Sequence, residues 1–284
     1  MKPTWLITGA SGFLSSRIID TLANQITFIA PTHAQLEITN AKSCSLFLNE
    51  YQPAVVVHAA AISQIDECER DPARSMLVNV RGAENLARAC TACGAKLLFC
   101  STDQVYSGCG GDEPLNEAAE LAPTNTYARH KLLAEAAVAE LCPNSASLRL
   151  TWMFDLPARG KHTNPNLITG LLHAAVTGAP RSYAANDHRA MTYVREVAEN
   201  LPLIAKAPAG VYNYGAENEL SSYETARGAL RLLGAQARMN ELVTPASGAA
   251  PRNLWMDTTK AQRVGCRFSR TLAGVERMLK EYGW

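Results

Sequence analysis

TWLITGASGFLSS, residues 4–16, contains the pattern that indicates the fold of this chain. Its first part is an apolar run, which predicts a buried strand, and its last part opens a segment with helical spacing. Between them, Gly9 permits a tight turn, and Gly12 lets the backbone approach a diphosphate at the helix N-terminus, where free N–H groups favour anions. A third glycine is typical at the position that Ser15 occupies. A plain glycine turn is the alternative, but its place directly after the first strand favours dinucleotide binding.

Apolar runs and helical segments alternate along the first half of the chain. The runs that predict strands are residues 4–10, 26–30, 35–39, 53–61, 95–102 and 145–154. The segments with helical spacing are residues 13–25, 41–52, 75–93 and 124–141, with Asn40 as a cap for the second. Because the strands are apolar throughout, they predict a parallel sheet that is covered on both faces.

The last third of the chain is more mixed. The pattern predicts a loop before a helix at 160–170, an extended piece and a helix within 184–201, a strand at 210–215 and a helix at 221–234. The fold class that follows is α/β: a Rossmann-like doubly wound parallel sheet with a smaller, interleaved C-terminal substrate-binding lobe. We expect residues 1–155, with parts of 184–215, to form the NAD(P)-binding domain. Residues 156–284 are expected to be mainly the substrate-binding lobe.

The amino-acid composition limits the cellular location and the classes of binding partner that we expect. Hydrophobic residues are 47% and charged residues 19%, as in a soluble globular protein. The formal net charge of +1 produces no field that would attract nucleic acid or an anionic membrane. The sequence has no pattern of a signal peptide or a membrane span. We therefore expect a cytoplasmic protein with a small-molecule substrate, and a homodimer is the default expectation for its assembly.

The eight cysteines are scattered and follow no disulfide framework. One pair, Cys90 and Cys93 in CTAC, has the spacing of a redox or metal motif. The pair lies near the end of an apolar helical run, and no second pair accompanies it. The sequence therefore predicts structural thiols and no metal site.

The residues after the second predicted strand bear on the choice of cofactor. A site for NAD usually has a carboxylate there, which binds the ribose 2′-hydroxyl. This chain has APTHAQ, residues 30–35, without an acid, and Thr32, His33 or Arg17 is in a position to contact a 2′-phosphate. The sequence therefore favours NADP(H), with NAD(H) as the alternative.

Two further stretches predict the chemistry. FCSTDQVYSG, residues 99–108, begins in a strand, and its hydroxyl side chains fall at the carboxyl edge of the sheet, where ligands bind. TYARHK, residues 126–131, has Tyr127 and Lys131 four positions apart, on one face of a helix. Either stretch alone is more simply a strand-end cap or a solvated helix face. Together they predict a proton relay: Thr102 bonds a substrate carbonyl, and the Lys131 ammonium and a cationic nicotinamide lower the pKa of Tyr127.

These motifs in combination resemble the extended short-chain dehydrogenase/reductase superfamily. The resemblance rests on TGxxGxxG, HAAA at 58–61, STDQVY at 101–106 and YARHK, and it covers nearly the whole chain. The amino-acid sequence around these motifs is most similar to that of the dTDP-4-dehydrorhamnose reductase branch. That branch implies an NAD(P)H-dependent reduction of a keto group on a nucleotide-linked deoxysugar.

The resemblance also implies a role for each matching residue. Thr102 takes the serine/threonine role, Tyr127 is the acid/base, and Lys131 lowers the pKa of the tyrosine and holds the nicotinamide ribose. The implied cofactor-binding residues, besides Tyr127 and Lys131, are Gly9, Ser11, Gly12, Phe13, Leu14, Glu37, Ile38, Ala59, Ala60 and Ala61. The implied substrate-binding residues are Ser63, Asp103, Gln104, Trp152, Asn164, Arg189 and Arg252. The two arginines suit nucleotide phosphates, and surface ion pairs are their alternative role.

Two departures from the branch keep other functions open, and Gln104 argues against a third function. NDHRAMTYVREVA, residues 186–198, is more similar to the matching segment of epimerases and dehydratases, and Ala250 stands where the branch often has an arginine. Gln104 replaces the glutamate of the dehydratases and cannot accept a proton as a carboxylate does, which disfavours dehydration. The alternatives are a sugar-nucleotide epimerase with tightly held NAD and a non-catalytic NADP-binding subunit, like the regulatory subunit of methionine adenosyltransferase.

Overall fold

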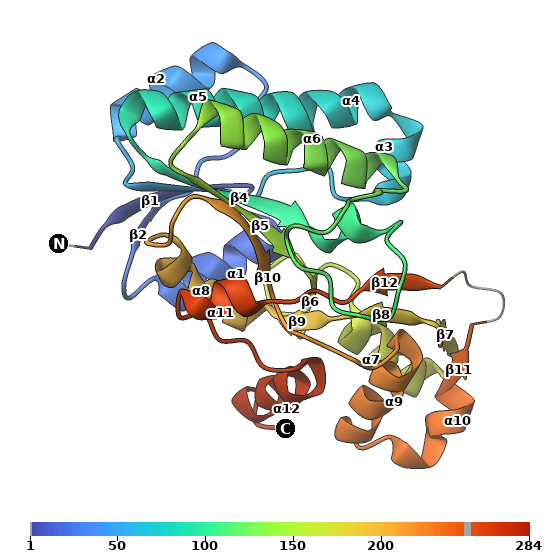
Figure 1. The fold of residues 1–284 in the computed structure, drawn as a ribbon. Helices are drawn as coiled ribbons and strands as arrows, with labels where there is room; N and C mark the ends of the chain where they lie inside the picture. The colour runs from blue at the N-terminus through green and yellow to red at the C-terminus, as the bar shows by residue number, and fades with distance from the viewer. Residues whose placement is uncertain (1, 247–250) are drawn as a thin grey trace.

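A six-stranded parallel sheet forms the centre of the molecule (Figure 1). The structure is a computed structural model, and it describes residues 2–246 and 251–284. The strand order is β10-β5-β4-β3-β1-β2, and all neighbours run parallel. The strands are β1 (Thr4–Thr8), β2 (Thr27–Ile29), β3 (Val55–His58), β4 (Lys96–Thr102), β5 (Ser145–Leu150) and β10 (Gly210–Tyr214). The expected Rossmann-like doubly wound sheet is confirmed.

Helices cover both faces of this sheet (Figure 1). One face packs against α2 (Ala41–Tyr51), α5 (Gly82–Cys93) and α6 (Thr126–Leu141). The other packs against α1 (Phe13–Leu22), α8 (Val194–Ile204) and α11 (Thr259–Arg263). The predicted cap is present, because the Asn40 side chain accepts a hydrogen bond from the backbone of Ser43. The helical segment predicted at 75–93 runs through α4 (Pro72–Met76), a π-helical turn (Leu77–Arg81) and α5.

A smaller lobe lies beyond the carboxyl ends of the large sheet (Figure 1). It contains three two-stranded parallel ladders and a hydrophobic core of its own. The ladders pair β6 (Trp152–Phe154) with β9 (Met191–Tyr193), β7 (Arg181–Tyr183) with β11 (Val243–Pro245), and β8 (Asp187–Arg189) with β12 (Arg252–Leu254). The helices are α7 (Leu167–Thr177), α9 (Ser222–Leu232), α10 (Met239–Leu242) and α12 (Thr271–Glu281).

Two predicted strands differ in the structure. Residues 35–39 form turns, because the Glu37 carboxylate accepts hydrogen bonds from the backbone N and Oγ1 of Thr39, two residues on. The run at 145–154 is two strands, β5 and β6, with Thr151 between them. The chain leaves the large sheet there, because the hydroxyl of Thr151 pairs with that of Thr192 beside β6 and β9. The run at 145–154 therefore contributes one strand to the large sheet and one to the smaller lobe.

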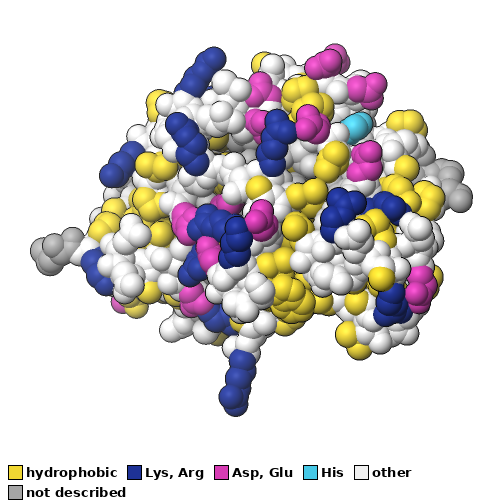
Figure 2. Space-filling view, turned by 90° about the horizontal axis from the view of Figure 1, so that it is seen from below, with side chains coloured by type: hydrophobic (Ala, Val, Ile, Leu, Met, Phe, Trp, Pro, Cys, Tyr) yellow, Lys and Arg dark blue, Asp and Glu magenta, His cyan; other side chains and the backbone are white. Residues whose placement is uncertain are grey.

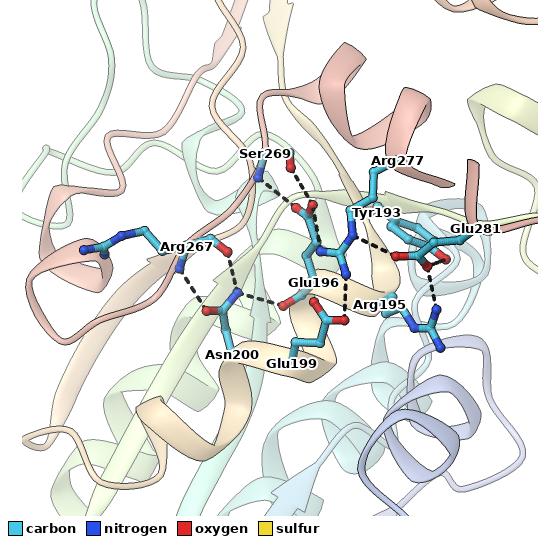
Figure 3. A network of polar contacts seen from close by, with 9 residues as sticks. All are labelled: Tyr193, Arg195, Glu196, Glu199, Asn200, Arg267, Ser269, Arg277 and Glu281. Atoms are coloured by element: carbon cyan, nitrogen blue, oxygen red, sulfur yellow. Dashed lines mark hydrogen bonds and ion pairs between the residues drawn. The ribbon is translucent and has the colours of Figure 1, made fainter. Parts of the chain in front are cut away.

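A polar network holds the C-terminal helix against α8 (Figure 3). The buried Glu196 accepts hydrogen bonds from the backbone N and Oγ of Ser269, at 2.8 and 2.6 Å, and from Arg277 at 3.3 Å. Arg277 also pairs with Glu199 at 2.7 Å and with Glu281 at 2.9 Å. One guanidinium on α12 thus bridges two carboxylates of α8 and one of its own helix, which fixes the chain's last helix to the sheet side of the molecule.

Charges of both signs are mixed on the surface. On the face seen from below, Lys and Arg side chains are interspersed with Asp and Glu (Figure 2). Within the described residues, every helix is too short or too polar to cross a membrane. The same residues include no cluster of three or more metal-ligating side chains. Cys90 and Cys93 lie at the end of α5, the first of them fully buried.

Candidate active site

A cavity of about 680 Å³ opens at the carboxyl ends of β1, β3, β4 and β5. It is lined by all three predicted catalytic residues, Thr102, Tyr127 and Lys131. The predicted substrate residues also line it: Ser63, Asp103, Gln104, Trp152, Asn164, Arg189 and Arg252. From the cofactor set, the lining includes Gly9, Gly12, Phe13, Leu14, Ala59 and Ala61. The fold therefore brings together most of the residues that the sequence singled out.

The glycine turn forms one wall of this cavity. Gly9 has a φ of +65°, and a Cβ at this position would lie 3.0 Å from the Cα of Ala60. Gly12 donates a hydrogen bond of 2.9 Å to the carbonyl of Gly9 and begins α1. Ser15 fills the place of the third glycine without strain, because its hydroxyl bonds the carbonyl of Thr8 in the buried interior. The turn thus packs directly against the backbone that follows β3, and any side chain at position 9 would push the two apart.

Four residues of the predicted cofactor set do not line the cavity: Ser11, Glu37, Ile38 and Ala60. Ile38 is buried against Gly82 of α5. Glu37 forms a local ion pair with the exposed His33, at 3.0 Å, in addition to its bonds with Thr39. Glu37 and Ile38 therefore lie outside the cavity lining, whereas Ala60 packs against the glycine turn next to it.

Arg17 is one of three residues proposed from the sequence as a contact for a 2′-phosphate, and the structure corrects this for Arg17. Its buried guanidinium donates to the carboxylate of Asp155 at 3.1 Å and to the carbonyl of His162 at 2.5 Å. These contacts direct the side chain toward the loop between β6 and α7 and away from the end of β2. Arg17 therefore orders that loop, which also contributes His162 and Asn164 to the cavity wall.

Thr102 and Tyr127, the predicted catalytic threonine and tyrosine, each lie at a helix cap. The Oγ1 of Thr102, at the end of β4, accepts from the backbone N of Gln104 and donates to Asp103 at 3.3 Å. Tyr127 lies in the first turn of α6, where Asn125 caps the backbone N of Ala128 at 2.8 Å. The strand end and the helix start thus present their hydroxyl groups to the same cavity.

A second cap on α6 was not predicted. Glu69, on the short helix α3 (Ile65–Arg70), accepts hydrogen bonds from the backbone N and Oγ1 of Thr126 at 2.6 and 2.8 Å. A carboxylate is favourable at this end of a helix because of the free N–H groups and the dipole. The sequence contains no local signal for it, since the two residues are 57 positions apart.

Burial is the largest influence on the pKa values of Tyr127 and Lys131, the predicted catalytic pair. It lowers the pKa of Lys131 to about 8, and the ammonium lies 4.0 Å from the centre of the Phe99 ring. Burial also raises the pKa of Tyr127 above its usual value, while the Thr102 hydroxyl lowers it and the Asp103 carboxylate raises it. Desolvation of the phenolate is thus the largest influence that the protein itself has on this pKa, whereas the lowering expected from the sequence includes a cationic nicotinamide.

A buried network behind Lys131 was also missed. Glu135, one turn further along α6, accepts a hydrogen bond of 2.5 Å from Ser101 and pairs with Arg149 of β5 at 2.8 Å. Arg149 also donates to the hydroxyl of Tyr106 at 2.7 Å. The position of Glu135 four residues after Lys131 is visible in the sequence, but its partners on β4 and β5 are not.

The substrate side of the cavity contains two arginine–aspartate pairs. Arg189 donates from Nε to the buried Asp103 at 3.1 Å, and its guanidinium carbon lies 5.0 Å from the centre of a Trp152 ring. Arg252 donates to Asp187 at 3.2 Å. Both arginines therefore have ion-pair partners and still face the cavity, so the two roles considered for them are compatible. Ala250, noted as a departure from the reductase branch, lies outside the described residues.

Comparison with known proteins agrees with this geometry. The chain matches the family model described as RmlD substrate binding domain over residues 3–283. It is 32% identical over 278 residues to a dTDP-4-dehydrorhamnose reductase from Streptomyces griseus, covering 93% of this chain and 88% of the relative. The fold is that of the extended short-chain dehydrogenase/reductases. Within that superfamily, the chain belongs to the RmlD substrate-binding-domain family.

Solved structures show the same fold. A dTDP-4-dehydrorhamnose reductase from Bacillus anthracis, in complex with NADP, aligns over 99% of both chains with a TM-score of 0.87 and 24% identity. A UDP-glucose 4-epimerase from Thermus thermophilus, in complex with NAD, aligns over 99% of both chains with a TM-score of 0.80 and 21% identity. Both a reductase and an epimerase are therefore built on this scaffold.

Proposed function

We propose that this protein reduces a keto group on a nucleotide-linked deoxysugar, with NADPH as the favoured hydride donor and NADH as the alternative. The observation that carries the proposal is the meeting of Thr102, Tyr127 and Lys131 with the glycine turn in one cavity. The family and the names of the reductase relatives support the substrate class.

The glycine turn supports a dinucleotide in this cavity. Gly9 packs against the backbone at Ala60, and Gly12 is the N-cap residue of α1. Both glycines line the cavity, and the first N–H groups of a helix favour an anion. When bound, the cofactor supplies the hydride. Lys131 holds the ribose hydroxyls, Thr102 donates a hydrogen bond to the carbonyl oxygen, and Tyr127 gives that oxygen its proton.

The end of β2 supports NADP(H) over NAD(H). Residues 30–35 contain no acid, and the nearby Glu37 carboxylate is already bonded to Thr39 and His33. A carboxylate committed in this way is a poor ligand for a ribose 2′-hydroxyl. The exposed Thr32 and His33 remain as groups that can approach a 2′-phosphate.

Two arginines support a substrate with a diphosphate. Arg189 and Arg252 lie on the paired strands β8 and β12 and both face the cavity. Guanidinium groups bind phosphate oxygens in a bidentate manner. We assign the sugar to the wall formed by Ser63, Asp103, Gln104, Trp152 and Asn164. The amide of Gln104 disfavours the elimination of water.

The substrate class is tested with a panel of ketosugars and purified protein. We expect NADPH to be consumed with nucleotide-linked 4-ketosugars, dTDP-4-keto-6-deoxy sugars among them. The matched control is the same ketosugar without its nucleotide, which lacks the diphosphate that the arginines bind. Equal rates with both would contradict the role assigned to the arginines, and no consumption with any member would contradict the reductase.

A second candidate is a sugar-nucleotide epimerase with tightly held NAD. The segment that contains Arg189 favours it, because its sequence is similar to epimerases. The two candidates differ in the cofactor balance: an epimerase recycles its cofactor, and a reductase consumes it. Nicotinamide that stays bound through purification, with product formed and no NADPH consumed, would favour the epimerase.

The remaining proposals rest on the sequence. We propose residues 1–155 as the cofactor domain, with parts of 184–215 returning to it, and residues 156–284 as mainly the substrate lobe. The pairing of β10 with β5 supports the return of the later segment. A cytoplasmic location and a homodimer complete the proposal.

A further inference from the structure

Asp103 and Arg189 form an ion pair next to the proposed proton donor. Their atoms Oδ2 and Nε are 3.1 Å apart, and the Asp103 side chain is only 2% exposed. The other carboxylate oxygen, Oδ1, accepts from the Thr102 hydroxyl at 3.3 Å and from the Gln104 amide at 3.2 Å. Arg189 thus bonds a carboxylate that itself touches the catalytic threonine.

The guanidinium of Arg189 is suited to two partners at once. Its Nε–H points to Asp103, and within the described residues its two Nη groups make no hydrogen bond. Four N–H groups therefore remain for a ligand in the cavity. A phosphate on those groups leaves the bond to Asp103 intact, and the flat ring of Trp152 supports the guanidinium from one side.

Without its partner, Asp103 would place a lone negative charge beside Tyr127. When a tyrosine gives up its proton it becomes a phenolate, and a nearby carboxylate opposes that change. Little water is available to screen the charge, because Asp103 is buried. The arginine removes most of this opposition by pairing.

We propose that Arg189 keeps Asp103 neutralised during catalysis, so that Tyr127 gives up its proton beside an ion pair instead of beside a lone carboxylate. Arg189 is then a positioning residue for proton transfer in addition to an anchor for phosphate. This inference rests on the proposed function, because it takes Tyr127 as the proton donor.

The other charged or titratable groups around Tyr127 do not offset Asp103. On β4 and α3, burial raises the pKa of the Cys100 thiol to about 11 and that of the Cys68 thiol above its usual value, so both are uncharged near neutral pH. On its own helix, Lys131 has a pKa lowered to about 8 and loses its charge above that pH. Arg189 is therefore the cation that remains paired with Asp103 at every pH used below.

The test is the midpoint of the pH profile of kcat in the direction of ketone reduction. Arg189→Gln exposes the Asp103 charge, so we expect the midpoint of the loss at high pH, measured with a more acidic fluorinated tyrosine at position 127, to rise by about one pH unit and the maximum rate to fall. Asp103→Asn leaves the arginine unpaired, so the midpoint moves down. The double variant has neither charge, and its midpoint returns close to that of the unmodified protein.

Arg252→Gln is the matched control. Arg252 lines the same cavity and has an aspartate partner, but that partner, Asp187, bonds to Ser222 at the start of α9 rather than to Thr102. We expect a higher KM for the nucleotide substrate and an unmoved midpoint. Arg189→Lys keeps the positive charge, so its pH midpoint should be close to that of the unmodified protein. Its KM should stay higher, since lysine cannot form two parallel hydrogen bonds to a phosphate as arginine does.

A readout without turnover separates this inference from the proposed function. A fluorinated tyrosine at position 127 is a stronger acid than tyrosine, and its 19F resonance reports ionisation directly. The same order of midpoints among the five variants would support the Arg189–Asp103 relation even if no ketosugar is reduced. If Arg189→Gln leaves both midpoints unmoved, or if the double variant does not restore them, Arg189 is an anchor for phosphate alone and the inference is wrong.

Discussion

Ser101 donates a hydrogen bond of 2.5 Å to Glu135, and this contact joins the strand that ends in Thr102 to the helix that carries Tyr127 and Lys131. We expect Ser101→Ala to lower the free energy of unfolding by about 2 kcal/mol, the size of a bond to a buried charge, and to lower kcat more than it raises KM. Thermal unfolding and steady-state kinetics check this. Ser101→Thr keeps the hydroxyl and should retain most of both; equal losses in the two variants would contradict a role for the hydrogen bond.

The Glu69 cap gives a second prediction. Hydrogen bonds from Thr126 hold the pKa of Glu69 below its usual value, so the cap stays charged across the neutral range. Glu69→Ala removes a partner from the first turn of α6, and kcat should fall severalfold because Tyr127 becomes less ordered. Glu67→Ala is the control, since Glu67 lies on the same helix but pairs with the exposed Arg74. Equal kcat values for the two variants would contradict the proposal that Glu69 orders Tyr127.

A comparison of Gly9 with Gly94 separates the effect of a left-handed backbone from the effect of a close neighbour. Both have a positive φ, +65° and +77°, but only Gly9 has a close neighbour; nothing lies within 4 Å of a Cβ at Gly94. Each change to alanine should cost about 1–2 kcal/mol of stability for the left-handed backbone. Gly9→Ala should cost more than Gly94→Ala, because its Cβ would lie 3.0 Å from the Cα of Ala60. Only Gly9→Ala should also weaken NADPH binding, measured by calorimetry. Unchanged NADPH affinity in Gly9→Ala would argue against a cofactor on this turn.

Lys131 predicts a pH dependence of stability. Its pKa is about 8 in the folded protein and near its ordinary value of 10.5 when unfolded. The unfolded chain therefore binds more protons between these values, and this group makes the free energy of unfolding rise as pH increases from about 8 to 10.5. Lys131→Met should flatten that rise in urea unfolding curves. A rise of the same slope in the variant would assign it to other groups.

Arg17 tests the correction to the cofactor site. Because its guanidinium pairs with Asp155, Arg17→Gln should lower the melting temperature and leave the ratio of NADPH to NADH affinity unchanged. His33→Ala is the comparison, since His33 is exposed near the end of β2. A selective loss of NADPH affinity in Arg17→Gln would restore the discarded expectation.

The sheet could be predicted because its strands are nearly continuous apolar runs. The error at 35–39 has a clear cause: Leu36 and Ile38 alternate as in a strand, and both are buried, but they reach the core from turns. The helix α3 was not predicted, since its six residues IDECER show little apolar periodicity. The break between β5 and β6 has no glycine or proline to mark it, and it depends on a contact between Thr151 and Thr192.

Some residues of the candidate site could likewise be predicted from the sequence, and others could not. Tyr127 and Lys131 could be found because one helical turn sets their spacing, and the glycine turn because it follows a strand. The contacts of Asp103 with Arg189 and of Glu135 with Arg149 join different elements, and no local spacing encodes them. The direction of the Tyr127 pKa was also beyond the sequence, because it depends on how deeply the fold buries the phenol.

The most direct test of the account is the rate of NADPH oxidation with a nucleotide-linked 4-ketosugar, measured for the unmodified protein and for Tyr127→Phe. The variant keeps the ring and loses only the proton donor, so its fold and its NADPH affinity should be retained. The account predicts a fall in kcat of about a hundredfold or more, as expected for the loss of a general acid. A folded, NADPH-binding variant that reduces the ketosugar at the unmodified rate would contradict it.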